Sequence, residues 1–167
     1  MKTLFFTKKL MFKNPIVKNI LSALAVAVFG FILLNLAFIF DFLVQSVVKG
    51  LIELFTPVDF ETNFQWLPPA MHGLFTVIIG IVSWFVFRSK LSTLYKAIYM
   101  TVPLAVVFVT LGIFLYRWPV AAYSLGSLLS IGVLYFFYRS KQPWLYYYTV
   151  ILVGLVLAIF SLLGGEI

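Results

Sequence analysis

The sequence predicts an all-α integral membrane protein with five transmembrane helices and an amphipathic helix on the membrane surface. Hydrophobic residues make up 63% of the 167 residues and charged residues only 10%, whereas soluble domains carry about 25% charged residues. The apolar residues occur in runs of about the 20 residues that a helix needs to cross a bilayer. The basic residues lie mostly between alternate runs, as in membrane proteins of fixed orientation. Lipid is therefore the expected solvent.

The predicted spans follow one another with short connections. The first follows a basic N-terminal segment and is expected to stay uncleaved, because only Ile20 to Leu24 precede an Ala-x-Ala pattern, fewer than the roughly 7–15 apolar residues of a signal peptide. Arg-Ser-Lys sequences end the second and fourth spans, and Arg-Trp-Pro ends the third. The five spans are residues 16–40, 70–87, 91–116, 120–138 and 144–163. No repeat or linker divides the chain, so residues 1–167 are expected to form a single membrane domain.

Residues 41–55 carry a different pattern from the spans. Asp41, Gln45, Lys49 and Glu53 are four apart, and steps of four on a helix drift only about 40°, so they form one polar stripe. The other positions are mostly Phe, Leu, Val and Ile. A crossing here would carry three ionisable groups through lipid, each costing about 2.5–3.5 kcal/mol near the bilayer centre. The pattern predicts a helix lying flat on the outer face, with Asp41 as a cap near its N-terminus.

Charge placement predicts the orientation. With five crossings and the N-terminus inside, all five acidic residues and only two basic residues, Lys49 and Arg117, fall outside. The other ten of the twelve basic residues fall inside: Lys2, Lys8, Lys9, Lys13, Lys18, Arg88, Lys90, Lys96, Arg139 and Lys141. This distribution follows the positive-inside rule, so we expect a multi-pass protein of the plasma (inner) membrane with its C-terminus outside.

Four residues are candidates for ligand binding: Asn35, Asp41, His72 and Pro103. Asn35 lies within the first span, where an amide is expected to bond to a neighbouring helix. His72 is the only histidine and enters the second span near the outer surface, within reach of the loop acids Asp59 and Glu61; the alternative is a hydrogen-bonded interfacial side chain. Pro103 is expected to kink the third span and free a backbone carbonyl.

Small residues recur every four positions in two spans. They are Ala122, Gly126 and Ser130 in the fourth span, and Gly154 and Ala158 in the fifth. Such ridges allow helix backbones to approach closely, either within the chain or between the chain and a partner. We therefore expect helix packing at these positions, and self-association or a protein partner remains an open alternative.

Several classes of chemistry are not expected. The chain has no cysteine and one histidine, so the ligands of a transition-metal site are missing and no metal or cofactor is predicted. No pair of acidic residues lies within the spans, and no serine there has a matching base, so no catalytic residue is assigned. The net charge of +7 is explained by a cytoplasmic rim facing membrane lipid, and nucleic acid is not an expected partner.

The function predicted first is non-catalytic, as a subunit or accessory component of a larger membrane assembly. The alternative is a small-molecule or lipid carrier with a cavity between the spans, near Pro103, Asn35 and His72. A third hypothesis is a membrane enzyme that acts on lipid at the outer face through His72 and Asp59 or Glu61.

Overall fold

The structure, a computed structural model, describes residues 14–55 and 66–162, and within these ranges it is entirely helical. Its helices are α2 (Pro15–Phe55), α4 (Leu67–Arg88), α5 (Thr93–Phe114), α6 (Pro119–Arg139) and α7 (Trp144–Leu162). By length and composition α2, α4, α5 and α6 are each able to cross a membrane, and the shorter α7 is apolar as well. The architecture agrees with the predicted all-α membrane class, and each predicted span coincides with one helix to within about three residues except at the end of the first.

Residues 41–55 do not form a separate surface helix, so this part of the prediction is wrong. They continue the first helix, and α2 runs without a break over 41 residues. Asp41 lies in the interior of this helix and does not cap an N-terminus. The physical reason is that the Asp41 carboxylate has a partner inside the bundle, described below, and so needs no break in the helix to reach water.

The continuous α2 is much longer than a bilayer is thick. At about 1.5 Å per residue its 41 residues extend about 60 Å, twice the roughly 30 Å of a hydrocarbon core. Its last part, residues 42–55, keeps the predicted amphipathic pattern, and Lys49 Nζ lies 3.8 Å from a carboxylate oxygen of Glu53, as the spacing predicts. The apolar side chains of this part are largely exposed, including Phe42, Leu51, Leu54 and Phe55.

The ends of α4 and α6 follow from local sequence. Pro68 and Pro69 lie in the first turn of α4, and Pro119 begins α6; proline suits this position because the first turn leaves its backbone N–H groups unpaired in any case. At the other end of α4, the backbone N–H of Ser89 donates to the carbonyls of Phe85 and Val86 and closes the helix. Short turns then return the chain for the next helix.

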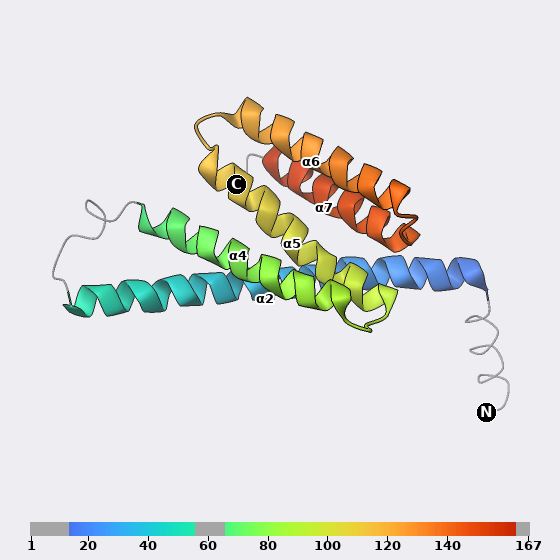
Figure 1. The fold of residues 1–167 in the computed structure, drawn as a ribbon, viewed down its shortest axis with the longest axis horizontal. Helices are drawn as coiled ribbons and strands as arrows, with labels where there is room; N and C mark the ends of the chain where they lie inside the picture. The colour runs from blue at the N-terminus through green and yellow to red at the C-terminus, as the bar shows by residue number, and fades with distance from the viewer. Residues whose placement is uncertain (1–13, 56–65, 163–167) are drawn as a thin grey trace.

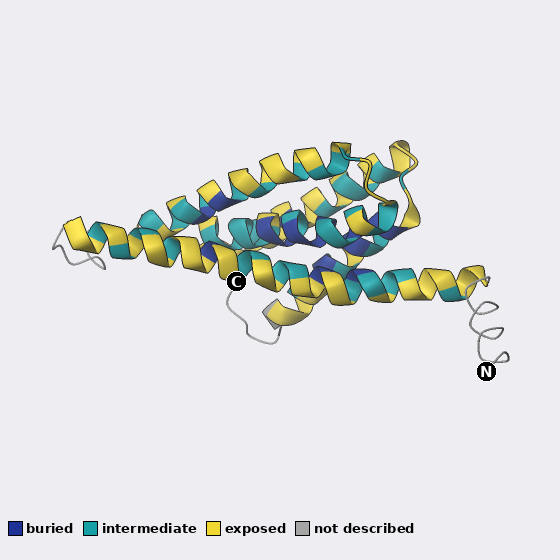
Figure 2. Ribbon diagram, turned by 90° about the horizontal axis from the view of Figure 1, so that it is seen from below, coloured by how far each residue is buried: buried dark blue, intermediate teal, exposed yellow. Residues whose placement is uncertain are grey.

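The central helix is α5, against which each of the other four helices packs. Figure 1 shows α6 and α7 on one side of α5 and the crossing pair α2 and α4 on the other. One buried cluster joins α2, α5 and α7 through Val26, Ala97, Met100, Tyr146 and Val150. A second joins α4 and α5 through Phe75, Val102 and Val106. Buried residues gather inside the bundle, and the outward faces present large apolar side chains, as a lipid-facing surface does (Figure 2).

The basic ends of the helices lie together. The beginning of α2, the α4–α5 turn and the α6–α7 turn are found at the same end of the bundle (Figure 1). The basic residues of these segments are Lys18, Arg88, Lys90, Lys96, Arg139 and Lys141. We call this the basic end of the bundle.

Gly30 marks a close approach of α2 and α5. It is buried, and a Cβ atom at this position would lie 2.6 Å from Thr101 Cγ2, closer than real Cβ atoms approach other atoms. The Thr101 hydroxyl lies 3.2 Å from the Gly30 carbonyl oxygen and 2.8 Å from that of Ile98. A small residue on one helix and a hydroxyl on the other are typical of contacts between membrane helices.

We predict that Gly30→Ala destabilises the protein by about 1–3 kcal/mol, because the new methyl group forces α2 and α5 apart against a stiff β-branched side chain. The matched control is Gly80→Ala on α4, where a Cβ would meet nothing within 4 Å; it is expected to be neutral or stabilising by up to about 1 kcal/mol. Unfolding of both variants in detergent micelles measures the difference. Equal stability of the two variants would contradict the close approach.

Candidate functional site

A chain of polar side chains joins α2, α4 and α5 inside the bundle. His72 Nδ1 lies 2.8 Å from Asp41 Oδ2, and His72 Nε2 lies 3.2 Å from Thr110 Oγ1. Thr110 Oγ1 in turn lies 2.9 Å from Thr76 Oγ1. The Thr76 hydroxyl also lies 2.9 Å from the carbonyl oxygen of His72. We call Asp41, His72, Thr76 and Thr110 the polar chain.

The two ionisable members of the polar chain are almost completely buried. Asp41 is 5% exposed and His72 is 4% exposed. His72 lies early in α4 and Thr110 late in α5, and because these helices are antiparallel neighbours, the two side chains meet at the same level of the bundle. Asp41 joins them from α2, although it lies 31 residues away along the chain.

Burial makes this arrangement energetically demanding. Removing a charged group from water costs several kcal/mol, which is recovered only when the group is well paired and hydrogen-bonded. Within the described ranges, each buried side-chain nitrogen or oxygen atom has a hydrogen-bond partner. The polar chain is therefore fully satisfied, and α2, α4 and α5 have to keep their relative positions for it to remain so.

The Thr110 hydroxyl has one proton and three polar neighbours. Its Oγ1 lies 2.6 Å from the Val106 carbonyl oxygen, in addition to its contacts with His72 and Thr76. A threonine hydroxyl donates one hydrogen bond and accepts up to two. Thr110 therefore donates to the Val106 carbonyl when His72 Nε2 carries a proton, and is free to donate to Nε2 when it does not.

The four predicted ligand-binding residues do not form one site. Asp41 and His72 are in contact. Asn35 is exposed, and its amide donates to the Phe31 carbonyl of its own helix at 2.7 Å, so the expected bond to a neighbouring helix is not formed. Pro103 lies within α5 on the wall of a separate cavity. The loop acids Asp59 and Glu61 lie outside the described residues, and both ring nitrogens of His72 face other partners.

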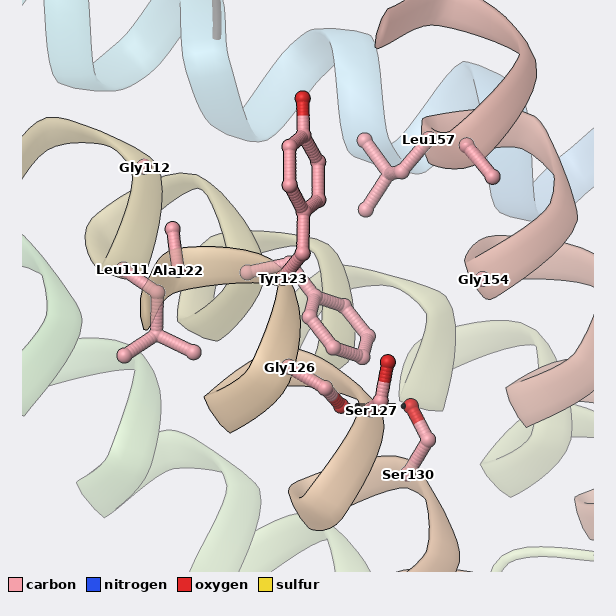
Figure 3. Close-up of a pocket in the computed structure, with 11 residues that line it drawn as sticks. Leu111, Gly112, Ala122, Tyr123, Gly126, Ser127, Ser130, Gly154 and Leu157 are labelled. Carbon is pink, nitrogen blue, oxygen red and sulfur yellow. Dashed lines mark hydrogen bonds between the residues drawn. The ribbon is translucent and has the colours of Figure 1, made fainter. Parts of the chain in front are cut away.

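The five small residues of the predicted ridges line one cavity. Ala122, Gly126 and Ser130 of α6 and Gly154 and Ala158 of α7 share it with Phe108, Leu111 and Gly112 of α5. Figure 3 shows Tyr123 and the labelled small residues around this space, with the Ser130 hydroxyl donating to the Gly126 carbonyl. The volume is about 170 Å³. Gly126 is buried and Ala158 is exposed, so the small residues surround a space that side chains leave open and that reaches the surface of the bundle. We call it the small cavity.

A larger cavity of about 570 Å³ lies closer to the basic end, between α5 and α6. Its wall is apolar and aromatic, and Lys96 and Gln142 add the long polar side chains. Lys96 Nζ donates to the Phe87 carbonyl oxygen at 2.8 Å. Its lining residues are Phe87, Lys96, Met100, Pro103, Leu104, Val107, Val133, Phe136, Phe137, Gln142 and Tyr146. We call this the large cavity.

Several of these residues escaped prediction from the sequence. Thr76 and Thr110 lie among apolar residues, and a threonine in a membrane helix usually bonds only to its own backbone, so the sequence gives no signal for them. Lys96 could have been found from the sequence, because it is the fourth residue of α5 and lies apart from the turn residues Arg88 and Lys90. Among the described residues, no group of three His, Cys, Asp or Glu side chains could hold a metal ion.

Comparison with known proteins adds no relative. No protein-family model matches the chain, and no curated protein and no solved structure matches it either.

We predict that Asp41 and His72 are energetically coupled. Removing one partner leaves a buried group unpaired, so Asp41→Ala and His72→Ala should each destabilise the protein by about 3 kcal/mol or more. The double variant should cost about 1–3 kcal/mol less than the sum of the two. Unfolding of the four proteins in micelles measures this coupling.

The matched control is Asn35→Ala on α2, whose side chain is exposed and bonds within its own helix. It should change stability by no more than about 0.5 kcal/mol. Strictly additive effects of the Asp41 and His72 substitutions would show that the contact contributes nothing to stability.

Proposed function

We propose that this protein is a non-catalytic membrane carrier that binds an amphipathic, lipid-like molecule in the large cavity between α5 and α6. The observation that carries the proposal is the size and lining of that cavity. Its volume of about 570 Å³ falls within the roughly 300–1,000 Å³ of small-molecule sites, whereas the small cavity, at about 170 Å³, falls below it.

The lining fits a molecule with a long apolar part. Phe87, Phe136, Phe137 and Tyr146 bring aromatic rings from three parts of the chain to the wall, and the rest is mainly aliphatic. Aromatic and branched side chains offer a large contact area to an acyl or polyprenyl chain, at roughly 25 cal/mol for each Å² removed from water. Such a wall gives affinity without specific hydrogen bonds along the chain.

The polar end of the cavity fits the headgroup. Lys96 lies in the second turn of α5 and Gln142 in the α6–α7 turn, so both are close to the basic end of the bundle. A lysine ammonium is a cation with three N–H donors. The Lys96 ammonium donates one hydrogen bond to the backbone, at the Phe87 carbonyl oxygen. A headgroup with acceptor oxygens would find the Lys96 ammonium and the Gln142 amide at this end.

Both cavities lie where α5 faces α6, and we call this interface the seam. Its open space would allow the two helices of the carrier to shift. Pro103, Leu104 and Val107 line the large cavity, and Phe108, Leu111 and Gly112 line the small one directly above it on α5. On α6 the small residues Gly126 and Ser130 fill little of this seam. A shift of α6 along α5 would join the two spaces into one longer site.

The proposal includes an orientation in the plasma (inner) membrane. The described basic residues of the basic end outnumber Lys49 and Arg117 at the opposite end, which supports a cytoplasmic basic end, five crossings and an external C-terminus. In this orientation the headgroup of the bound molecule faces the cytoplasmic side, and residues 42–55 of α2 lie at or beyond the outer surface.

A second candidate, the membrane subunit that the sequence first predicts, is favoured by residues 42–55. Phe42 is 69% exposed, Leu54 79% and Phe55 84%. This segment extends α2 past the length needed for one crossing. An apolar face in this position is suited to another membrane protein, and a stoichiometric protein bound after gentle purification would favour this function over the carrier.

We predict that Val133→Trp empties the large cavity of its bound molecule. The wild-type protein, purified in native nanodiscs, should carry a lipid or other amphiphile detected by mass spectrometry at about one per chain. The indole would occupy the space of several chain methylenes, and losing the burial of two or three of them, at about 0.8 kcal/mol each, lowers binding by about tenfold or more.

The control is Leu128→Trp, at a 69% exposed position of the same helix that lies outside the cavity wall. It should retain the bound molecule at the wild-type level. A wild-type protein that carries only bulk membrane lipid, in the same amount as both variants, would rule out the carrier function.

We predict that the orientation can be read by labelling single cysteines, since the native chain has none. Cysteine in place of Ser46 on α2 should react with a membrane-impermeant reagent from outside intact cells. Cysteine in place of Ser89 or Ser140, in the turns of the basic end, should react only after the membrane is opened. External labelling at 89 or 140 would reverse the orientation.

A further inference from the structure

We propose that the molecule held in the large cavity is an anionic lipid with a phosphate headgroup, and that Lys96 selects its negative charge. This inference rests on the carrier function proposed above and adds the chemical class of the headgroup. It is carried by three polar side chains of the cavity wall, Lys96, Gln142 and Tyr146, and by the distribution of charge around them.

The Lys96 ammonium lies at the edge of the large cavity. Its Nζ donates to the Phe87 carbonyl oxygen at 2.8 Å, and both residues line the cavity. Phe87 lies in the last turn of α4, where backbone carbonyls have no partner within the helix and a positive charge is favoured. This contact fixes the ammonium and uses one of its three N–H donors. Among the described residues Lys96 has no further polar partner, so two donors remain for a bound molecule.

The other two polar side chains are positioned by Phe137. The backbone N–H of Gln142, in the α6–α7 turn, donates to the Phe137 carbonyl oxygen at 3.0 Å. The ring of Tyr146, in the first turn of α7, lies 5.7 Å from the Phe137 ring between centroids. All three residues line the large cavity. The wall therefore has Lys96 on α5 and two more polar side chains where α6 turns into α7.

These side chains add donors that the protein leaves unused. Neither the Gln142 amide nor the Tyr146 hydroxyl has a hydrogen-bond partner among the residues that the structure describes. The amide supplies two N–H donors and the hydroxyl supplies one. A ligand group with several acceptor oxygens suits a wall in which an ammonium, an amide and a hydroxyl all have donors to spare.

No carboxylate faces Lys96 within the described ranges. The two acidic residues there, Asp41 and Glu53, lie in the second half of α2, and each has a partner of its own. Lys96 is half-buried in a mainly apolar wall and is one of the six basic residues of the basic end. Burying a charge is costly without an opposite charge close to it. A ligand of net negative charge supplies that charge, whereas a zwitterionic headgroup brings a further cation to the basic end.

A phosphate group fits these donors better than a carboxylate does. A phosphate monoester has three strong acceptor oxygens, so the ammonium, the amide and the hydroxyl can each meet a different one. A carboxylate has only two oxygens. Hydrogen bonds from a lysine ammonium to phosphate oxygens are also about twice as strong as those between neutral groups. The apolar tail of the lipid then lies along the aromatic and aliphatic part of the wall.

Competition between two lipids tests the headgroup. The full-length protein is placed in nanodiscs that contain equal amounts of phosphatidic acid and phosphatidylcholine with identical acyl chains, and native mass spectrometry identifies the retained lipid. The wild-type protein should retain phosphatidic acid about tenfold or more over phosphatidylcholine, as hydrogen bonds to a charged group allow. Equal retention of the two lipids overturns the headgroup assignment and leaves the carrier function standing. Retention of neither lipid overturns both.

Three variants separate Lys96 from the general charge of the basic end. Lys96→Gln removes the cation but keeps a donor for the Phe87 carbonyl, so the preference should fall to about twofold or less while lipid is still bound. Lys96→Arg keeps the cation and should keep most of the preference. The matched control, Lys90→Gln, removes the same charge from the exposed α4–α5 turn outside the wall and should behave as the wild type. An unchanged preference in Lys96→Gln, or an equal loss in Lys90→Gln, overturns the role of Lys96.

Inorganic phosphate distinguishes a lipid headgroup from a free anion. Added to the wild-type nanodiscs, it should leave the retained phosphatidic acid unchanged, because it lacks the chain that the apolar wall binds. Displacement of the lipid by inorganic phosphate would indicate a site for the free anion and overturn the assignment to a lipid.

Discussion

The contact between Asp41 and His72 is the constraint on which the arrangement of three helices depends. Lipid and packed apolar side chains offer no hydrogen bonds, so a polar group inside the bundle has to be satisfied by another protein group. Asp41 on α2 meets this requirement through His72 on α4, and His72 reaches Thr110 on α5. Together the three helices are held at one level and one rotation by this chain of contacts.

The packing of α5 against α2 differs from its packing against α6. Against α2 the contact is tight, because Gly30 allows the Thr101 side chain to approach the backbone. Against α6 small residues have the opposite result: Gly126 and Ser130 border open volume, and a Cβ added at Gly126 would only reach ordinary contact with Phe108 at 3.5 Å. One side of α5 is therefore held firmly, and the other borders open space.

The sequence predicts the helices well because the signals that define them are local. Apolar runs, the prolines that begin α4 and α6, and the basic turns all lie within a few residues of the ends that they determine. The partner of Asp41 lies 31 residues away, and the sequence does not show this contact. A charged residue within an apolar run was therefore expected to reach water, and this required a break in the helix. The same limit applies to the small residues, whose spacing predicts that they share a face but not whether a neighbour fills it.

The continuity of α2 has a consequence for how the polar chain and the exposed segment are related. A hinge at Asp41 would let residues 42–55 move while the buried pair stayed in place. Because the helix is unbroken, a tilt imposed on that segment, by a partner or by the membrane surface, turns the Asp41 side chain as part of the same rigid body. His72 and Thr110 then have to follow or lose their hydrogen bonds, and Thr110 belongs to the stretch of α5 that borders the small cavity. The long α2 helix thus connects whatever contacts its Phe55 end to the loosely packed side of α5.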